Sequence, residues 1–164
     1  MDKAGIKIDV LIPVYKPDVK FRHLMERLKK QKDKPNRIIL LQTIEEDKHI
    51  EPVGEEYIAY AMELEDSDFP IECIEIQRKD FDHGGTRAYG ASLSDADLIM
   101  FMTQDAVPAD TLLITKFKEA FKNPDVGAAY ARQLPREDAG AIETYTRRFN
   151  YPEADQIKAL NDLP

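Results

Sequence analysis

The sequence has one cysteine and no tryptophan among its 164 residues. A lone thiol at Cys73 cannot form an intrachain disulfide, and the paired cysteine spacings typical of structural zinc sites are absent from the sequence. The cysteine content therefore favours a protein of a reducing compartment that is not held together by covalent crosslinks.

Long apolar runs and an excess of basic residues are also missing. No stretch approaches the length needed to span a bilayer, and the opening MDKAGIKIDVLIPVY lacks the apolar core and cleavage site of a signal peptide. Asp and Glu number 31 against 23 Lys and Arg, giving a net charge of -8, which argues against nucleic acid as a partner. We expect a cytoplasmic protein; a position at the inner face of the cell membrane is implied only by the family resemblance described below.

Three common sequence motifs for phosphate binding or acyl transfer do not occur. The sequence has no G-x-x-x-x-G-K-[ST] loop and no G-x-G-x-x-G after a strand, which removes most support for an ATPase or a dinucleotide-binding enzyme. It has no G-x-S-x-G, which disfavours a serine hydrolase. The first strand ends in Pro13-Val14-Tyr15 without a carboxylate, which disfavours a phospho-acceptor receiver domain.

What the chain does have is an alternation of strand and helix patterns. Apolar residues make up 43% of the sequence, enough for one domain with a real core. Predicted strands are 8–14, 38–41, 71–77 (with an irregularity midway), 98–102 (buried on both faces) and 126–131. Five helices are predicted. One is capped by Asp18, a weak one lies within 44–68, one covers 86–93, one is capped by Asp110, and the last covers 139–149. This order indicates an α/β fold with a largely parallel sheet.

Polar loops follow four of these elements, at 13–16, 42–45, 79–85 and 103–106. In an open α/β sheet the carboxyl ends of the strands form the ligand-binding edge. The loops carry what a nucleoside diphosphate needs: Tyr15 to pack on the base or ribose, Lys79 and Arg87 as counter-charges, and His83 and Asp105 as candidate metal ligands. Gly84 and Gly85 are expected to let backbone N–H groups approach a ligand closely.

Four segments, in this order and spacing, carry a family resemblance: DVLIPVYKPD, FDHGGTRAYGA, LIMFMTQDAVP, and GAAYARQLP with RFNYP after it. They span most of residues 9–152, and the chain resembles the N-terminal part of a family 2 inverting glycosyltransferase, within it bacterial rhamnosyltransferases. The resemblance implies a Rossmann-like GT-A nucleotide-sugar-binding fold. It implies one domain over residues 1–164, with a nucleotide-sugar-binding core at 1–135 and the start of an acceptor-side region at 136–164.

The same resemblance implies which residues form the donor site. Asp105 corresponds to the last acid of the family's D-x-D signature and would bind magnesium or manganese. Thr103 replaces the first acid, and Gln42-Thr43 stands where many members have acids, a pattern that the rhamnosyltransferase subgroup accommodates. The expected nucleotide-sugar site comprises Pro13, Val14, Tyr15, Gln42, Lys79, Asp82, His83, Gly85, Arg87, Gln104 and Asp105.

The resemblance implies a parent enzyme that transfers a sugar from a dTDP- or UDP-linked donor to a polysaccharide or lipid-linked acceptor, with inversion at the anomeric carbon. The resemblance to the rhamnosyltransferase subgroup implies rhamnose as the sugar. Its catalytic base is a carboxylate well downstream of Asp105, and Glu137, Asp138 and Glu143 come too early to fit that role. We therefore expect the chain to be the N-terminal part of a longer protein, with the base beyond Pro164.

Each assignment has a plainer alternative. Asp105 could be a turn acid before a proline, His83 a loop histidine, Arg87 a solvated helix charge and Tyr15 a packing residue. The chain as a whole could be a non-catalytic α/β nucleotide-binding or interaction module, which the missing first acid at Thr103 would suit. A nucleotidyltransferase is less favoured, because the sequence has no G-x-G-T-R near its N-terminus.

Overall fold

The computed structural model of the chain describes residues 5–45, 53–64, 69–136 and 138–162. It divides into two compact units, Met1–Pro124 and Asp125–Pro164. Parts of the predicted 44–68 loop, Glu137, and the last two residues, 163–164, lie outside the described residues. The domain division expected at residue 135 stays a prediction.

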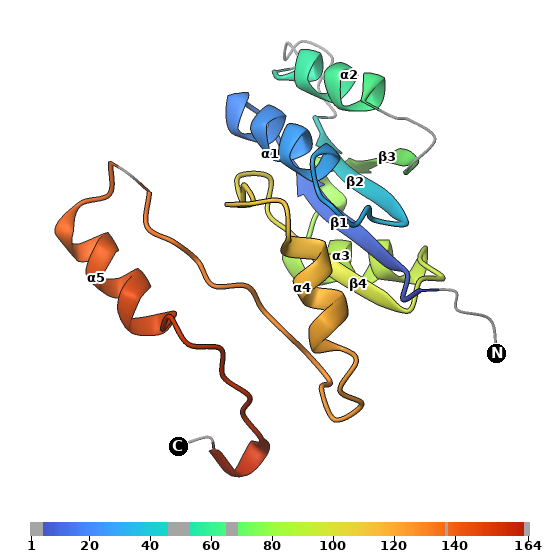
Figure 1. Cartoon of the computed structure of the whole chain (residues 1–164). Coiled ribbons are helices and arrows are strands. Elements are labelled where there is room, and N and C mark those ends of the chain that lie inside the picture. Colours follow the sequence, from blue (N-terminus) through green and yellow to red (C-terminus); the bar gives the residue numbers. More distant parts are fainter. Residues whose placement is uncertain (1–4, 46–52, 65–68, 137, 163–164) are drawn as a thin grey trace. The chain divides into compact units, whose positions relative to one another are not determined.

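A four-stranded parallel sheet forms the centre of the first unit (Figure 1). Its strands are β1 (Ile8–Val14), β2 (Arg37–Ile44), β3 (Ile71–Gln77) and β4 (Leu98–Phe101). The spatial order is β3-β2-β1-β4, so the chain first winds outward from β1 and then crosses over to its other side. The predicted α/β fold with a parallel sheet is confirmed. The switch in direction lies between β1 and β4, where open α/β sheets bind their ligands.

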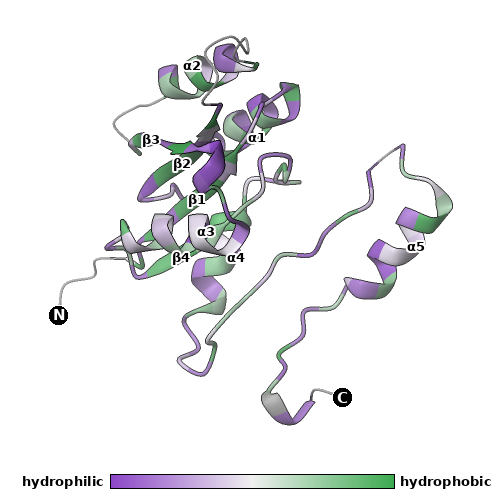
Figure 2. Ribbon diagram, turned by 180° about the vertical axis from the view of Figure 1, so that it is seen from behind, coloured by the Kyte–Doolittle hydropathy of each residue, from purple (hydrophilic) through white to green (hydrophobic). Residues whose placement is uncertain are grey.

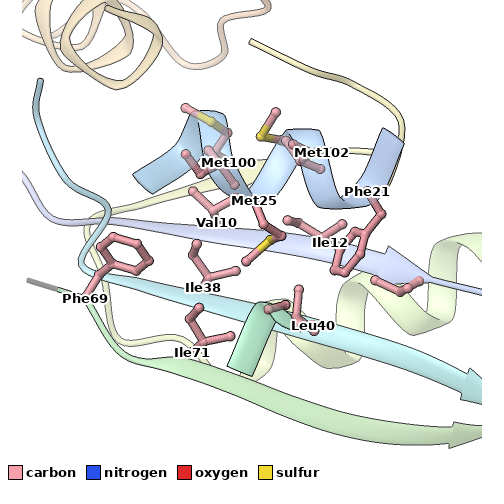
Figure 3. Close-up of a cluster of buried hydrophobic side chains, with 14 of the residues drawn as sticks. Val10, Ile12, Phe21, Met25, Ile38, Leu40, Phe69, Ile71, Met100 and Met102 are labelled. Atoms are coloured by element: carbon pink, nitrogen blue, oxygen red, sulfur yellow. The ribbon is translucent and has the colours of Figure 1, made fainter. Parts of the chain in front are cut away.

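Helices cover both faces of this sheet. They are α1 (Val19–Lys29), α2 (Glu55–Glu63), α3 (His83–Ser92) and α4 (Leu113–Ala120), with a short 3-10 turn η1 (Arg78–Asp80) before α3. The larger core joins the sheet to α1, α2 and α4, and Figure 3 shows Phe21 and Met25 of α1 against Val10, Ile12 and Leu40 of the strands. Because strand residues alternate between faces, these inward positions are fully excluded from water.

Helix α1 forms where the sequence predicts it. The Asp18 side chain accepts a hydrogen bond from the backbone N–H of Lys20 at 2.8 Å, which satisfies a donor that the first helical turn leaves free. The apolar residues of this helix fall on one face and are all buried: Phe21, Leu24, Met25 and Leu28.

The opposite face of the sheet carries a smaller core of Leu11, Ile39 and Leu41, covered by α3. Gly90 makes this close packing feasible. A Cβ atom at Gly90 would lie 2.7 Å from Cδ1 of Leu41 and closer still to Cδ1 of Leu11. Any larger residue would therefore push the helix away from the strands.

Several sequence predictions need correction in the first unit. The β2–β3 ladder runs unbroken from Ile71 to Gln77, so the expected irregularity is absent from this described strand. Strand β4 is not buried on both faces, because it pairs only with β1 among the described strands and leaves Phe101 49% exposed. Asp110 does not cap α4, since it accepts from the N–H of Leu112, and Leu112 is itself the N-cap.

Helix α3 and the segment after α4 also differ from the expectation. Helix α3 starts at His83, three residues before the predicted start, because Asp82 caps it. Residues 126–131 are described and form no strand, although their composition favours one. Strand formation needs a pairing partner, and this segment belongs to the second unit, where no sheet is described.

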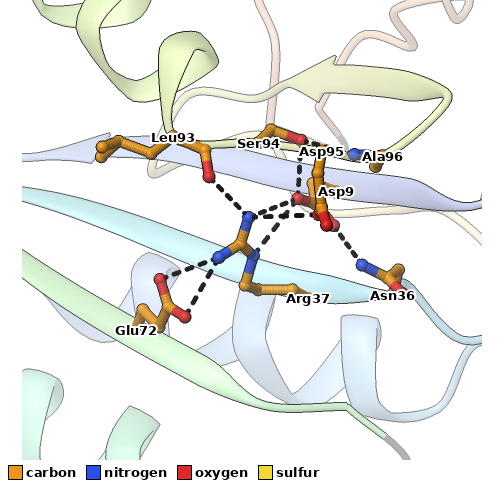
Figure 4. A network of polar contacts seen from close by, with 8 residues as sticks. All are labelled: Asp9, Asn36, Arg37, Glu72, Leu93, Ser94, Asp95 and Ala96. Carbon is orange, nitrogen blue, oxygen red and sulfur yellow. Dashed lines mark hydrogen bonds and ion pairs between the residues drawn. The ribbon is translucent and has the colours of Figure 1, made fainter.

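A buried ion pair closes the amino-terminal edge of the sheet (Figure 4). The Arg37 guanidinium lies 3.0 Å from the Asp9 carboxylate, which also accepts from Asn36 and Ser94 at 2.7 Å each. Burial of Asp9 opposes its ionisation, but the hydrogen bonds from Asn36, Ser94 and Arg37 outweigh burial and lower its pKa. This edge is opposite to the carboxyl edge, so the network supports the fold and not the candidate site.

The second unit contains α5 (Ala141–Asn150) and the short η2 (Leu160–Asp162). Figure 2 shows that α5 carries both hydrophobic and hydrophilic residues, and Ile142, Tyr145 and Phe149 are all more than two-thirds exposed. Arg136 pairs with Glu143 at 3.3 Å and so ties the preceding segment to the helix. Among the described helices, none combines the length and the apolar content needed to cross a membrane.

Candidate functional site

A hollow of about 420 Å³ lies at the carboxyl edge of the sheet, next to the switch point. Loops after β1, β3 and β4, the end of β2 and the start of α3 meet there. Its lining comprises Pro13, Val14, Tyr15, Thr43, Arg78, Phe81, His83, Arg87, Thr103 and Gln104. The volume is in the range of about 300–1,000 Å³ that small-molecule sites occupy.

The lining is cationic although the protein is acidic. It contains two arginines, Arg78 and Arg87, and one histidine, His83, but no carboxylate. The chain as a whole has a net charge of -8. A local reversal of sign in a concave site concentrates an anionic ligand there, so the hollow suits a phosphorylated molecule.

Gln104 fastens the loop after β1 to the loop after β4. Its side-chain oxygen accepts from the N–H of Tyr15 at 2.8 Å, and its side-chain NH2 donates to the carbonyl of Tyr15 at 3.1 Å. Both polar ends of the amide are therefore engaged with the protein backbone. Gln104 therefore fixes the position of the backbone at Tyr15.

Two cationic side chains lie over the Tyr15 ring. The guanidinium carbon of Arg78 and the ammonium nitrogen of Lys16 each lie 5.0 Å from the ring centroid. The Tyr15 hydroxyl donates to Glu45, and Lys16 pairs with the same carboxylate at 3.6 Å. The hydrogen bond from Tyr15 lowers the pKa of Glu45 and keeps it ionised. These contacts hold the ring at the rim of the hollow with its plane fixed.

Thr43 is the most informative residue of the lining. It lies at the end of β2, is 6% exposed, and its hydroxyl oxygen is fully buried without a hydrogen-bond partner among the described residues. Leaving a buried hydroxyl unpaired costs about 1–3 kcal/mol. A ligand that enters the hollow could supply the missing partner.

The start of α3 does not offer free N–H groups to a ligand. The Asp82 carboxylate accepts from Gly84 at 3.0 Å and from Gly85 at 2.6 Å, and these hydrogen bonds lower its pKa. The expectation that the N–H groups of Gly84 and Gly85 approach a ligand is therefore wrong. Asp82 occupies the position that an external anion would take.

Arg87 projects from α3 toward the hollow and is held in place by its own helix. One guanidinium nitrogen donates to the carbonyl of His83 at 2.8 Å. The His83 ring packs edge to face on Phe81, with 5.1 Å between the centroids. The cation and the two rings therefore form one wall whose parts hold each other in position.

Asp105 is exposed and lies outside the lining of the hollow, directly after Gln104. The described residues contain no group of three or more His, Cys, Asp or Glu side chains placed to hold a metal ion. One carboxylate fits a divalent ion only if the ligand completes the coordination, as the phosphates of a nucleotide do for magnesium. The donor set thus fits a metal shared with a diphosphate, not a site made by the protein alone.

The structure brings together some of the expected site residues and leaves others apart. The hollow unites Pro13, Val14, Tyr15, His83, Arg87 and Gln104. The other expected residues lie outside its lining: Gln42, Lys79, Asp82, Gly85 and Asp105. Gln42 faces away and accepts a hydrogen bond from Cys73 at 3.3 Å.

Sequence reasoning did not include Thr43, Arg78, Phe81 and Thr103 among the site residues. A signal was present for Thr43, because alternation along β2 places Gln42 and Thr43 on opposite faces of the sheet. Arg78 directly follows β3 and is the first residue of the η1 turn, and its guanidinium lies over the Tyr15 ring.

Comparison with known proteins identifies relatives in sequence and in fold. The chain is 32% identical over 159 residues to the O-antigen chain rhamnosyltransferase RfbN of Salmonella typhimurium, which covers 96% of this chain and 47% of the relative. It is 35% identical over 98 residues to the O-antigen chain rhamnosyltransferase WbaN of Salmonella anatum, covering 59% of this chain and 31% of the relative. The chain thus spans about half the length of the first relative and about a third of the second.

Among solved structures, the crystal structure of S. aureus TarS 1-349 superposes with a TM-score of 0.52 over 81% of this chain and 40% of that chain. The identity is 14%, so this likeness shows the shared fold. The model of the family described as "Glycosyl transferase family 2" matches residues 9–163. Since that match covers nearly the whole chain, the chain belongs to glycosyl transferase family 2.

Proposed function

We propose that this chain binds the nucleotide-sugar donor of an inverting glycosyltransferase that transfers rhamnose. The observation that carries the proposal is the hollow at the switch point, which has cations and a buried unpaired hydroxyl but no carboxylate in its lining. The donor is a dTDP- or UDP-linked sugar, and the acceptor is a glycan or a lipid-linked saccharide. The names of the RfbN and WbaN relatives support rhamnose as the sugar.

Four residues of the lining would contact the donor directly in this proposal. The Tyr15 ring packs on the base or ribose, and Thr43 supplies a hydrogen bond in the buried end of the hollow. Arg78 and Arg87 neutralise the diphosphate, to which guanidinium groups can make two parallel hydrogen bonds. A site of this kind works in the cytoplasm, and a lipid-linked acceptor would bring the enzyme to the inner face of the membrane.

A divalent ion, magnesium or manganese, belongs to the same proposal. Asp105 would be its protein ligand, and the phosphate oxygens of the donor would complete the coordination. When bound, such an ion stabilises the negative charge that develops on the departing diphosphate. The chain's own part is to present one carboxylate next to the cationic hollow.

In the proposed reaction, an acceptor hydroxyl oxygen forms a bond to the anomeric carbon of the sugar while the bond from that carbon to the diphosphate breaks. The hydroxyl proton passes to a carboxylate base, which must lie within hydrogen-bond reach. We assign that base to the part of the full enzyme beyond Pro164. These 164 residues would then bind the donor, and activation of the acceptor would require the additional residues.

Calorimetric titration of the chain with dTDP and UDP, with and without magnesium or manganese, tests this proposal. We expect binding that the metal strengthens and that Asp105→Ala returns to the metal-free level. Asp155→Ala removes an exposed carboxylate from the second unit and serves as the matched control. Equal metal enhancement in Asp105→Ala would show that Asp105 is not the metal ligand. Absence of binding by both nucleotides would favour a non-catalytic interaction module.

A further inference from the structure

A second hollow, of about 400 Å³, lies within the second unit and is not explained by donor binding. Its lining comprises Tyr130, Ala131, Gln133, Asn150 and Tyr151. All of these residues belong to Asp125–Pro164, whereas the donor hollow is formed by residues of Met1–Pro124. It is a separate site in the chain.

Contacts within the unit hold the two walls of this hollow together. The Tyr130 and Tyr151 rings meet edge to face, with 6.1 Å between centroids and 74° between planes. Arg132 and Glu153, which flank the lining on each wall, pair at 3.5 Å. The N–H of Tyr151 donates to the carbonyl of Arg147 at 2.9 Å, which fixes this tyrosine at the end of α5.

The chemistry of the lining is neutral, aromatic and rich in amides. Phenol rings present flat apolar faces, and the carboxamides of Gln133 and Asn150 each offer both a donor and an acceptor. The lining has no cation to bind a phosphate and no carboxylate to bind a metal or an amine. A pyranose ring has the complementary surface, because its C–H face packs on aromatic rings and its hydroxyls both donate and accept hydrogen bonds.

We propose that Tyr130, Gln133, Asn150 and Tyr151 form a binding site for a neutral glycan. The inference rests on the proposed function, since the acceptor of such a glycosyltransferase is a glycan. It adds a location and a ligand chemistry, namely one pyranose unit seated against two tyrosines and hydrogen-bonded to two amides. Tyr130 is 73% exposed, so its ring is open to a ligand without rearrangement of the fold.

Saturation-transfer NMR on the whole 164-residue chain tests this site. The probes are methyl glycosides of rhamnose, glucose and galactose, lipid-free O-antigen polysaccharide, and glucuronate as an anionic probe, each with dTDP in the same sample. We expect saturation transfer to the neutral saccharides and weaker transfer to glucuronate. Tyr130→Ala and Tyr151→Ala should each weaken saccharide binding roughly twofold to tenfold, because the flat apolar face on which the pyranose packs is lost.

Matched variants separate the site from general effects. Tyr145→Ala removes another exposed tyrosine of the same unit, outside the hollow, and should bind saccharide as the wild type does. Tyr130→Phe keeps the ring and should bind more tightly than Tyr130→Ala. Circular dichroism checks that each variant folds, and an unchanged dTDP signal checks that the donor hollow is intact.

The outcomes distinguish the two proposals. If dTDP gives a signal and no neutral saccharide does, the glycan site is wrong and donor binding stands. If saccharide binds equally to wild type, Tyr130→Ala and Tyr151→Ala, the assignment to this hollow is wrong. If saccharide binding depends on these tyrosines while dTDP does not bind, the glycan site stands and the donor proposal fails.

Discussion

At the scale of single residues, Thr43 links the packing of the sheet to ligand binding. The buried hydroxyl at the end of β2 has no hydrogen-bond partner among the described residues, so it lowers the free energy of unfolding. A valine side chain at the same position would not carry this penalty. We expect Thr43→Val to raise the free energy of unfolding by about 1–3 kcal/mol, since the two side chains have the same shape and the unpaired hydroxyl is removed. Chemical denaturation measures this change.

The same substitution should weaken nucleotide binding. Loss of one hydrogen bond worth about 0.5–1.5 kcal/mol corresponds to a roughly twofold to tenfold lower affinity for dTDP by calorimetry. Thr111→Val, at an exposed threonine away from the hollow, is the control and should bind normally. An unchanged affinity in Thr43→Val would show that the hydroxyl has no part in the ligand contact.

The ionisation of Asp9 makes the stability of the fold depend on pH. Its pKa is lowered in the folded protein because hydrogen bonds from Asn36, Ser94 and Arg37 outweigh its burial. Because the pKa of Asp9 is lower in the folded protein than in the unfolded chain, its ionised form stabilises the fold. This stabilisation is fully present above the unfolded-chain pKa of about 3.9, and it is lost as the pH falls through the folded-state pKa. We therefore expect the free energy of unfolding to decline below about pH 4 in wild type.

Asp9→Asn should lower stability by about 1–3 kcal/mol at neutral pH, because Arg37 loses its buried charged partner and keeps only more exposed carboxylates, the nearest being that of Glu72 at 3.1 Å. It should also flatten the acid decline of stability in denaturation experiments from pH 2 to 7. Asp95→Asn is the matched control, since Asp95 lies 4.0 Å from the same guanidinium but its side chain is 93% exposed. Exposed pairs contribute little, so the control should change stability by less than about 1 kcal/mol.

At the scale of elements, the approach of α3 to the sheet depends on Gly90. A methyl group there would overlap Leu11 and Leu41, both fully buried, so Gly90→Ala should cost about 1–3 kcal/mol through overpacking. The gain in helix propensity offsets about 1 kcal/mol of this cost. Gly84→Ala changes the same helix where a Cβ would meet only Asp82 at 3.5 Å. Thermal denaturation should rank Gly90→Ala below Gly84→Ala, and the reverse order would contradict the packing argument.

Elements with a strong local pattern could be predicted from the sequence, and elements that depend on distant partners could not. The sequence of α1 contains its own cap at Asp18 and its own apolar stripe, so its start and buried face follow from local chemistry. Residues 126–131 have strand-forming composition but no pairing partner in their unit, so they form no strand. The apolar composition of β4 suggested burial on both faces, whereas its place in the sheet leaves Phe101 exposed.

At the scale of the whole molecule, the chain has two compact units with different tasks in our proposals. Because the lining of the donor hollow comes entirely from Met1–Pro124, a polypeptide of residues 1–124 should bind dTDP within about twofold of the full chain. A polypeptide of residues 1–135, the core expected from the sequence, should bind dTDP with the same affinity. Calorimetry on all three measures this, and loss of binding in the 1–124 polypeptide alone would show that residues 125–135 contribute to the donor site.

The sequence by itself determined the α/β class, the parallel strands, the first helix and the family, because these depend on local periodicity and on motifs in a fixed order. Tertiary structure decided which residues meet. The order β3-β2-β1-β4 places Tyr15 beside Gln104, which lies 89 positions further along the chain. Strand order is set by pairing between segments far apart in the chain, and no local pattern specifies it.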